Sequence, residues 1–435
     1  MRFLFALLLV LPIASPLSSV APPSGAKEEP ARADVVVIKG ATIMTATKGV
    51  IENGIVVIKD GKIAAVGKDV DIPAGATVIG ATGKFLTPGI IDTHSHMGVY
   101  AWPGVKANSD GNEAVHPIMS NVRAEDGVNL EDPAFKRALA GGVTTIQILP
   151  GSANMVGGES FVCKLRLGSL ESMRFEGAPR GLKMASGENP KRVYGGRGQL
   201  PSTRMGNFAV LREYFEKARE YRDKWKKYDE KKAKGEEATP PDKDLKLETL
   251  KDVMDGKVLV HIHCYRMDEM ATLIQIAKDF GWKIASFQHA LEAYKVADLL
   301  AKEDIAIATW ADWWGFKMEA WDGIPWNASM CAKAGVRTSI HSDSSDGVQR
   351  LYTEVAKCIR YGLSEEDALK AITYIPATML GVDKRTGSIE VGKDADLALF
   401  SKHPFDVTTL VEKTWIDGKL VFDRKVNKDY FGGVR

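Results

Sequence analysis

Short runs of alternating apolar and polar residues occupy the beginning and the end of the chain. Between residues 34 and 89 they read DVVVIKGATIM, GIVVIKDGKIAAVG and ATVIGATGKFLTPG, with glycines at the turns. The tail has the same pattern in GSIEVGKDADLALF and TWIDGKLVFD. Alternation of this kind is typical of half-buried β-strands. The pattern predicts a small β-sandwich domain built from residues 34–88 and 382–425, with another domain inserted between them.

A different pattern fills residues 89–381. Apolar, strand-like runs alternate there with helix-length stretches, which is typical of repeated βα units around a parallel sheet. Eight runs qualify, namely GIIDTHSHM, GVTTIQILPG, SFVCKLRLG, RGLKMASG, VLVHIHCY, KIASFQHA, IAIATWA and VRTSIHSD. Eight units fit an α/β fold of the (β/α)8 TIM barrel type, whose active site lies at the carboxyl ends of the strands. An open doubly wound sheet is the alternative, but no glycine-rich phosphate turn follows the first strand.

Residues 212–248 stand apart within the barrel region, because they mix both charge signs densely and contain two adjacent prolines. A solvated helix followed by a linker explains this composition. An interaction arm is the alternative. We expect a charged helical insert at this place in the barrel.

Residues 1–25 carry a basic Arg2, a short apolar stretch and then small residues and prolines. This order is typical of a secretory signal peptide and predicts a secreted or periplasmic protein. A signal anchor is the alternative, although the apolar run is short for crossing a bilayer. We expect no stable membrane span after signal cleavage.

Composition narrows the choice of partner. Lys and Arg number 58 against 56 Asp and Glu, so the net charge is only +2. This balance gives no electrostatic reason to expect nucleic acid as a partner. We expect a small-molecule substrate, and the sequence leaves homo-oligomer formation open. The four cysteines lack the spacing of a disulfide framework, so we expect buried thiols.

The histidines are concentrated at the ends of the predicted barrel strands. Strand ends at one rim of a barrel converge in space, and neutral imidazoles beside a carboxylate are the ligands of a divalent first-row metal. In GIIDTHSHMG, His94 and His96 are two residues apart, so they point the same way and can bind one ion. Asp343 follows the last strand. Six of the eight histidines lie at such ends: His94, His96, His261, His263, His289 and His341.

The motif PGIIDTHSHMG, the β-rich lead-in and the closing GKDADLALF resemble the amidohydrolase superfamily, particularly its imidazolonepropionase-like and Xaa-Pro dipeptidase-like members. The resemblance covers nearly the whole chain after the signal. It implies one or two divalent metal ions, usually zinc. By this resemblance the metal ligands are His94, His96, His261, His289 and Asp343.

The resemblance also implies a residue that bridges two metal ions. A carboxylated lysine, or sometimes a glutamate, from the third or fourth strand has this role in two-metal members. Lys183 in GLKMASGENPKR is the first candidate, although it lies one residue closer to ASG than in relatives. Glu188 is the second candidate and Lys164 a third, and the metal count stays open.

The expected chemistry follows from these ligands. A zinc ion would activate a water molecule and polarise a carbonyl group. The resemblance casts Asp343 as the catalytic acid and base. If only one ion is bound, His289 is better placed to polarise the tetrahedral oxyanion than to bind metal. His263 and His341 are candidates for substrate contact or for support of the ligands.

Two loop features point to the substrate. Arg192 could pair with a substrate carboxylate, since guanidinium groups bind carboxylates with two parallel hydrogen bonds. The stretch TWADWWGFKMEAWDGIPW after the seventh strand holds five tryptophans, which can wall a pocket for an apolar group or pack over the barrel's own helices.

We therefore expect an amidohydrolase that uses metal-activated water to cleave a C–N amide bond in a dipeptide, an N-acyl amino acid or a cyclic amide. Deamination of a heterocycle is the alternative within the superfamily, although Glu269 comes late after the strand-five histidine. A non-catalytic binding protein with the same fold is the third reading, and the retained metal ligands argue against it.

Overall fold

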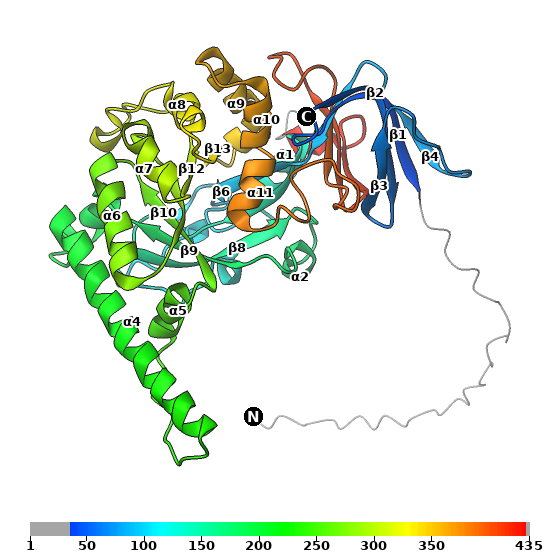
Figure 1. Cartoon of the computed structure of the whole chain (residues 1–435). Helices are drawn as coiled ribbons and strands as arrows, with labels where there is room; N and C mark the ends of the chain where they lie inside the picture. Colours follow the sequence, from blue (N-terminus) through cyan, green and yellow to red (C-terminus); the bar gives the residue numbers. More distant parts are fainter. Residues whose placement is uncertain (1–34, 432–435) are drawn as a thin grey trace, which may run out of the picture. The chain divides into compact units, whose positions relative to one another are not determined.

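The computed structural model describes residues 35–431 (Figure 1). The predicted signal peptide lies outside these residues. Among the described residues the strands form two sheets of eight strands each. No helix of this part of the chain combines the length and apolarity that a bilayer crossing requires.

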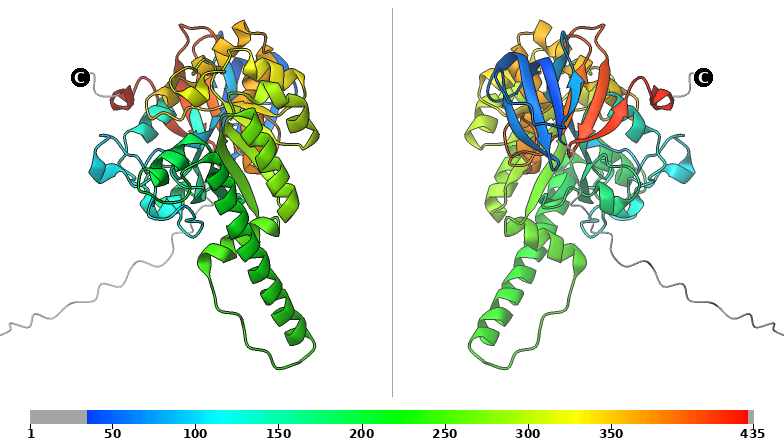
Figure 2. Two further views of the ribbon diagram at one scale, coloured as in Figure 1. Left: turned by 90° about the vertical axis from the view of Figure 1, so that its left-hand side faces the viewer. Right: turned by 90° about the vertical axis from the view of Figure 1, so that its right-hand side faces the viewer.

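The first sheet joins strands from both ends of the chain. Its order is β16-β15-β14-β5-β1-β2-β3, with β4 paired to β1. Figure 2 shows the N-terminal and C-terminal strands side by side. The strands are β1 (Val36–Met44), β2 (Val50–Lys59), β3 (Lys62–Gly67), β4 (Thr77–Gly80), β5 (Phe85–Pro88), β14 (Leu397–Phe400), β15 (Val411–Ile416) and β16 (Lys419–Asp423). The inward-facing apolar residues, among them Ile38, Leu86 and Trp415, form one buried cluster.

The second sheet contains all eight predicted barrel strands in sequence order. Its rim is joined across the remaining gap by a hydrogen bond from the backbone N–H of Asp343 to the carbonyl of His94, at 3.1 Å. The fold is thus the expected α/β barrel. The strands are β6 (Ile90–Ser95), β7 (Val143–Ile148), β8 (Val156–Lys164), β9 (Arg180–Ala185), β10 (Val258–Cys264), β11 (Ile284–His289), β12 (Ala306–Thr309) and β13 (Thr338–Ile340).

One barrel strand differs from the expected parallel arrangement. Strand β8 runs antiparallel to both of its neighbours, β7 and β9. Only residues 149–155 connect β7 to β8. A parallel crossover needs a dozen or more residues, so a link this short forces the chain to turn back. The carboxyl end of β8 therefore lies at the rim opposite to those of the other seven strands.

The helices follow the strands and cover the barrel. Amphipathic helices such as α6 and α9 bury one face and expose the other. The four cysteines are buried and unpaired, as expected. The helices are α1 (Ala134–Ala140), α2 (Leu170–Met173), α3 (Glu188–Gly195), α4 (Arg204–Ala233), α5 (Leu245–Met254), α6 (Met267–Phe280), α7 (Ala297–Lys302), α8 (Asn327–Lys333), α9 (Leu351–Arg360), α10 (Glu365–Ala371) and α11 (Tyr374–Leu380).

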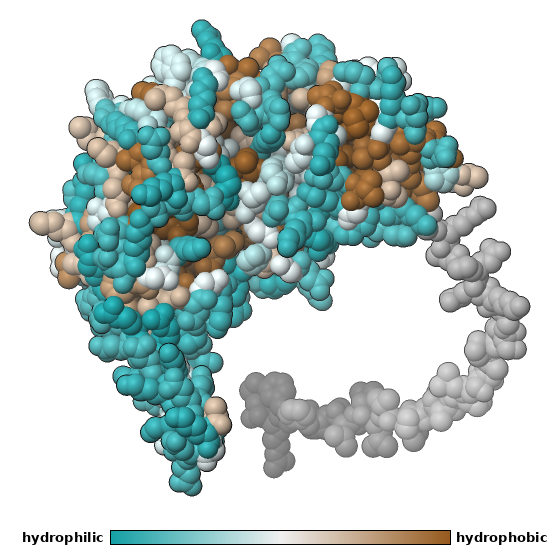
Figure 3. Space-filling view, in the orientation of Figure 1, coloured by the Kyte–Doolittle hydropathy of each residue, from teal (hydrophilic) through white to brown (hydrophobic). Residues whose placement is uncertain are grey.

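The charged insert contains the long helix α4 and the return segment to α5. The helix begins at Arg204, before the predicted bound at residue 212, with its N-terminus capped by the Thr203 hydroxyl. Its buried residues extend as far as Tyr221, just past the middle of the helix, and the rest of the second half is mostly exposed. Figure 3 shows this second half as a hydrophilic projection. The densely charged part of the insert is thus the part of α4 that projects away from the barrel into solvent.

Candidate metal centre and active site

The ends of β6 and β13 bring three candidate metal ligands together. His94 lies in β6, His96 follows its end, and Asp343 follows β13. One ligand atom from each of these three side chains lies within 4.8 Å of the others. The Nε2 atoms of His94 and His96 are 3.7 and 3.4 Å from Asp343 Oδ1. The alternation of side chains along a strand explains why both rings reach the same point.

The hydrogen bonds of the two rings fix where their lone pairs point. Nδ1 of His96 donates to the carbonyl of Leu149 at 2.8 Å, and Nδ1 of His94 donates to Oε1 of Gln288 at 3.0 Å. With a proton on each Nδ1, both Nε2 atoms carry bare lone pairs. These atoms face each other at 3.3 Å, beside a carboxylate. A cation between them removes the repulsion, so the donor set fits a divalent metal ion.

The charge states of these groups suit metal binding. Burial lowers the pKa of His96 to about 3 and holds the pKa of His94 well below its ordinary value. Both rings are therefore neutral near pH 7 and can act as ligands. Burial also raises the pKa of the Asp343 carboxyl. A metal ion would counteract that penalty, because it stabilises the ionised carboxylate.

Of the other four predicted histidines, His289 and His341 adjoin this group, and His263 lies against His289. His289 Nδ1 lies 4.0 Å from Asp343 Oδ2, and its ring centroid is 4.5 Å from that of His94. His263 and His341 lie against His289, with ring centroids 4.6 and 5.0 Å away. His261 receives its orientation from the Ser286 hydroxyl, 2.8 Å from Nδ1. Nitrogen atoms on three of these rings are buried without a hydrogen-bond partner: His261 Nε2, His289 Nδ1 and both nitrogens of His341.

Of the bridge candidates, Lys183 adjoins a predicted ligand. It lies on β9 directly beside His261 of β10 in the parallel register, and it is fully buried. Its Nζ donates one hydrogen bond to the carbonyl of Pro150 at 3.0 Å. Burial lowers the pKa of this amine.

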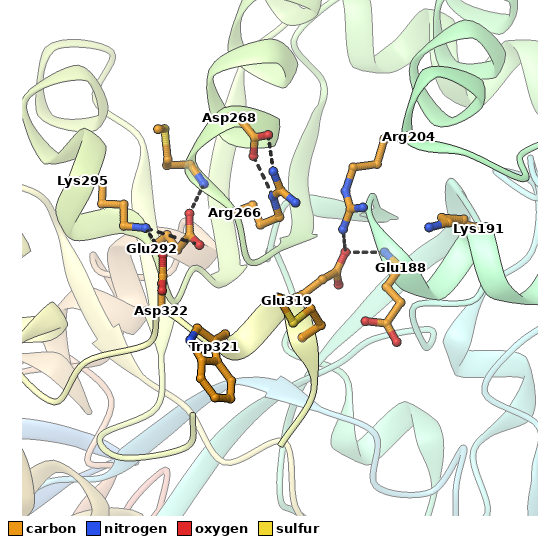
Figure 4. Close-up of a pocket in the computed structure, with 12 residues that line it drawn as sticks. Glu188, Lys191, Arg204, Arg266, Asp268, Glu292, Lys295, Glu319, Trp321 and Asp322 are labelled. Atoms are coloured by element: carbon orange, nitrogen blue, oxygen red, sulfur yellow. Dashed lines mark hydrogen bonds and ion pairs between the residues drawn. The ribbon is translucent and has the colours of Figure 1, made fainter. Parts of the chain in front are cut away.

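Glu188 lies elsewhere. It opens α3 and lines a pocket of about 550 Å³ in which none of the candidate metal ligands takes part (Figure 4). In Figure 4 its backbone N–H points to Glu319, which Arg204 also contacts. The geometry therefore supports Lys183 more strongly than Glu188 as a bridge.

Lys164, the third candidate, has a different place because β8 is reversed. Its ammonium group lies at the rim next to the first sheet and pairs with three carboxylates, those of Asp394, Asp396 and Asp417, at 2.8, 2.9 and 2.6 Å. All but Asp417 are almost fully buried. The third candidate for the bridge, Lys164, is therefore wrong, since this lysine joins the barrel to the loops of the first sheet.

Within the described part of the chain, no hydrogen bond or ion pair joins Arg192 to the metal group. Its side chain is exposed on α3 and forms no ion pair with the described residues. The aromatic loop after β12 reaches the site instead: Trp310 stacks on His289, with centroids 4.4 Å apart, and Trp313 stacks on Trp310. Other tryptophans of this loop, including Trp321 and Trp326, are exposed at the surface.

Several site features were missed from the sequence. Gln288 orients His94, and Asp92 accepts hydrogen bonds from the backbone and hydroxyl groups of Ser342, which ties β6 to β13. His289 and Asp343 both have a left-handed backbone, with φ of 71° and 46°. Such a backbone is unusual for non-glycine residues and is concentrated at functional sites. The short polar side chains beside the histidine motifs are the only sequence signal for these features.

Comparisons with known proteins show which proteins this chain is similar to. The family model described as Amidohydrolase family matches residues 285–422. Amidohydrolase tasK from Hapsidospora irregularis is 34% identical over 399 residues, which are 86% of this chain and 40% of that protein. The chain thus spans well under half the length of that relative. Imidazolonepropionase from Geobacillus sp. (strain WCH70) is 25% identical over 397 residues, covering 81% of this chain and 84% of that protein.

A solved structure also matches most of this chain. The crystal structure of an amidohydrolase from Thermotoga maritima MSB8 has 41% sequence identity and a TM-score of 0.83, and the match covers 89% of this chain and 100% of that one. Identity at this level along an entire relative means that this chain belongs to the amidohydrolase family, a family of hydrolases.

Proposed function

We propose that this protein is a metal-dependent amidohydrolase that cleaves the C–N amide bond of a small substrate: a dipeptide, an N-acyl amino acid or a cyclic amide. The observation that carries the proposal is the pair of bare Nε2 lone pairs of His94 and His96, 3.3 Å apart beside Asp343. Neither ring has another use for its Nε2. The metal dependence of the family supports the same reading.

We assign His94, His96 and Asp343 to metal binding, with His261 and His289 as the further ligands and zinc as the ion. Zinc suits a site of imidazole and carboxylate donors. A zinc ion bound here supplies a Lewis acid that activates a water molecule and polarises the substrate carbonyl. The second ion, if present, needs Lys183 as its bridge.

Asp343 moves the proton in this proposal. Its Oδ1 faces His94 and His96 and its Oδ2 faces His289, while the side chain remains 23% exposed. A carboxylate in this position can take a proton from the attacking water and deliver it to the leaving nitrogen. Since the leaving nitrogen departs as an amine, this proton transfer is needed for C–N cleavage.

If only one ion is bound, His289 is not needed as a ligand and instead stabilises the developing negative charge. Burial holds its pKa well below the ordinary value, so the ring is neutral. Its Nδ1 is buried without a partner and lies 4.0 Å from Asp343 Oδ2. In the tautomer with a proton on Nδ1, the ring can donate to the oxyanion of the tetrahedral intermediate. His263, which bonds the Ser152 hydroxyl at 2.9 Å, and His341 complete the wall of the site.

Heterocycle deamination has less support. Its expected acid, Glu269, is buried on α6 and its carboxylate pairs with Arg204 at 2.5 Å. A carboxylate engaged in this ion pair is not free to protonate a ring nitrogen. Amide hydrolysis needs only the groups that border Asp343.

The proposal is tested on purified protein by metal analysis and an activity screen. We expect one or two equivalents of zinc. The screen covers dipeptides, N-acyl amino acids and cyclic amides, with the released amine measured. Treatment with 1,10-phenanthroline should remove both the metal and the activity, and added zinc should restore both. His94→Ala should lower zinc content and abolish turnover.

The matched control is His403→Gln, since His403 lies in the domain of the first sheet beside Phe85 and away from the metal group. This variant should keep the zinc content and the activity of the wild type. Full turnover in protein shown to be free of metal would contradict the proposal, and so would a His94→Ala variant with wild-type zinc content.

A further inference from the structure

The wall of the site contains one cation that no part of the proposed chemistry uses. Lys317 follows Phe316 in the loop after β12, and its Nζ lies 4.2 Å from the ring centroid of Tyr265. Tyr265 in turn stacks on His289, with centroids 5.3 Å apart. Lys317 thus lies over a ring that itself stacks on His289, a member of the metal group's surroundings.

The ammonium group of Lys317 has unused hydrogen-bonding capacity. Its nearest acceptors are Asn189 Oδ1 at 3.4 Å and Glu319 Oε2 at 3.5 Å, both longer than an ordinary charged hydrogen bond. Glu319 also serves other donors, because its Oε1 accepts from Arg204 and from the backbone of Glu188 (Figure 4). Its Oε2 faces Lys317, so among the described residues Lys317 has no acceptor closer than 3.4 Å.

The surroundings make an incoming anion favourable at this point. The Lys317 side chain is only 18% exposed. Burial lowers its pKa, which means that the ammonium has lost part of its hydration. An anion that enters beside such a cation restores the lost interaction, and the low local dielectric strengthens the pair.

An apolar surface adjoins the cation. The rings of Tyr265, Trp310 and Phe316 contact one another with centroids 5.9 to 6.3 Å apart. Phe316 is half exposed, so the surface is open to a ligand. A cation beside aromatic rings matches a ligand that carries a carboxylate next to an apolar side chain.

From this geometry we propose that Lys317 is a specificity-determining residue that binds a carboxylate of the substrate, while Tyr265, Trp310 and Phe316 hold an adjacent apolar side chain. The inference rests on the proposed function for the identity of the bond that is cleaved. Within that function it selects N-acyl amino acids and dipeptides with an apolar side chain over uncharged cyclic amides. It also replaces Arg192, which is exposed on α3, as the carboxylate anchor.

The test measures binding, which needs no turnover. The probes are 3-phenylpropanoate and its neutral counterpart 3-phenylpropanamide, titrated calorimetrically into the zinc-loaded protein. The wild type should bind the carboxylate at least tenfold more tightly than the amide. In Lys317→Met the ratio of the two Kd values should fall to near one, and in Lys317→Arg most of the preference should remain.

Two further variants make the result specific. Lys283→Met removes a positive charge from an exposed lysine before β11, at the opposite rim of the barrel, and should keep the wild-type ratio. Arg192→Met should keep it as well. If Lys317→Met retains the full preference, or if Arg192→Met loses it, the inference is overturned. Retained preference in Lys317→Met would mean that the carboxylate binds the metal ion instead.

The binding readout separates this inference from the proposed function. A wild-type protein that prefers the carboxylate probe but cleaves no amide of the screen contradicts the proposed function alone. A wild-type protein that cleaves amides but binds both probes equally contradicts the role of Lys317 alone. A second measure of the carboxylate preference comes from turnover. For any N-acyl amino acid that is cleaved, its kcat/KM is divided by the kcat/KM of the N-acyl amine that lacks the carboxylate.

Discussion

Lys183 and His261 are direct neighbours across two parallel barrel strands, β9 and β10. Because parallel neighbours in register point to the same side of the sheet, the amine of Lys183 shares the barrel interior with a candidate metal ligand. Burial favours the uncharged amine. An uncharged lysine can add carbon dioxide to form a carbamate with release of a proton, and a carbamate supplies two oxygen ligands.

The first prediction concerns this lysine. Lys183→Ala should reduce zinc from two equivalents to one if Lys183 bridges two ions, and should leave the content unchanged if the wild type holds one. Metal analysis on the wild type and the variant checks this. Glu188→Gln is the matched comparison, since Glu188 lines the neighbouring pocket. A loss of one equivalent in Glu188→Gln and none in Lys183→Ala would assign the bridge to Glu188.

The second prediction concerns Asp343. Asp343→Asn should lower kcat by about 10²- to 10⁴-fold, the usual effect of removing a general acid or base. The fold should persist because asparagine tolerates the left-handed backbone that this position requires. Steady-state kinetics checks the loss of kcat, and circular dichroism checks that the fold persists. Asp346→Asn, at an exposed aspartate three residues on, should keep wild-type kcat. Wild-type kcat in Asp343→Asn would rule out its role in proton transfer.

The third prediction concerns the join between the barrel and the first sheet. Lys164→Met should lower the free energy of unfolding by about 3 to 5 kcal/mol, because it leaves buried carboxylates without their central cation. Urea unfolding checks this. Arg166→Met removes a more exposed partner of Asp417 and should cost only about 0 to 1 kcal/mol. If both variants lose the same free energy of unfolding, the burial of Lys164 does not increase its contribution to stability.

The fourth prediction concerns pH. Burial alone would raise the pKa of Asp394, but hydrogen bonds from Arg385 and Lys164 outweigh it and hold the pKa at about 2, below the ordinary 3.8. A depressed pKa contributes stability that is present above pH 4 and is lost as the pH falls toward 2. Asp394→Asn should therefore be less stable than the wild type by about 2 kcal/mol at pH 7, with the gap narrowing below pH 4. Urea unfolding between pH 3 and 7 measures the difference in free energy of unfolding between the two proteins. If this difference does not change with pH, the depressed pKa of Asp394 is not its cause.

The pattern of apolar runs was sufficient to predict the eight barrel strands, because each run is long enough to span the barrel and is bounded by turn residues. The histidines at their ends could be found for the same reason. The direction of a strand could not be predicted, because an apolar run looks the same whichever way the strand runs in the sheet. The reversal of β8 depends on the short link after Ile148, and it explains why Lys164 lies far from the rim where a lysine on a parallel strand would be.

The substrate-facing residues were harder to predict. Arg192 and Lys317 are both loop or helix-end cations in the sequence, and only the fold shows that one is exposed while the other lies over the ring of Tyr265. The left-handed backbone at His289 is equally invisible, because it is imposed by the surrounding structure and contradicts the local preference of the residue.

The first sheet has a consequence for protein synthesis. Strand β5 pairs with β1 on one side and with β14 on the other, so its second neighbour lies about three hundred residues further along the chain. While the ribosome is still making the barrel, the nascent chain carries β5 with an open edge, which is a site for pairing with foreign strands. Strand β14 can close that edge only after the completed polypeptide has left the ribosome. A chain that terminates before residue 397 therefore keeps β5 with an unpaired, aggregation-prone edge beside the barrel.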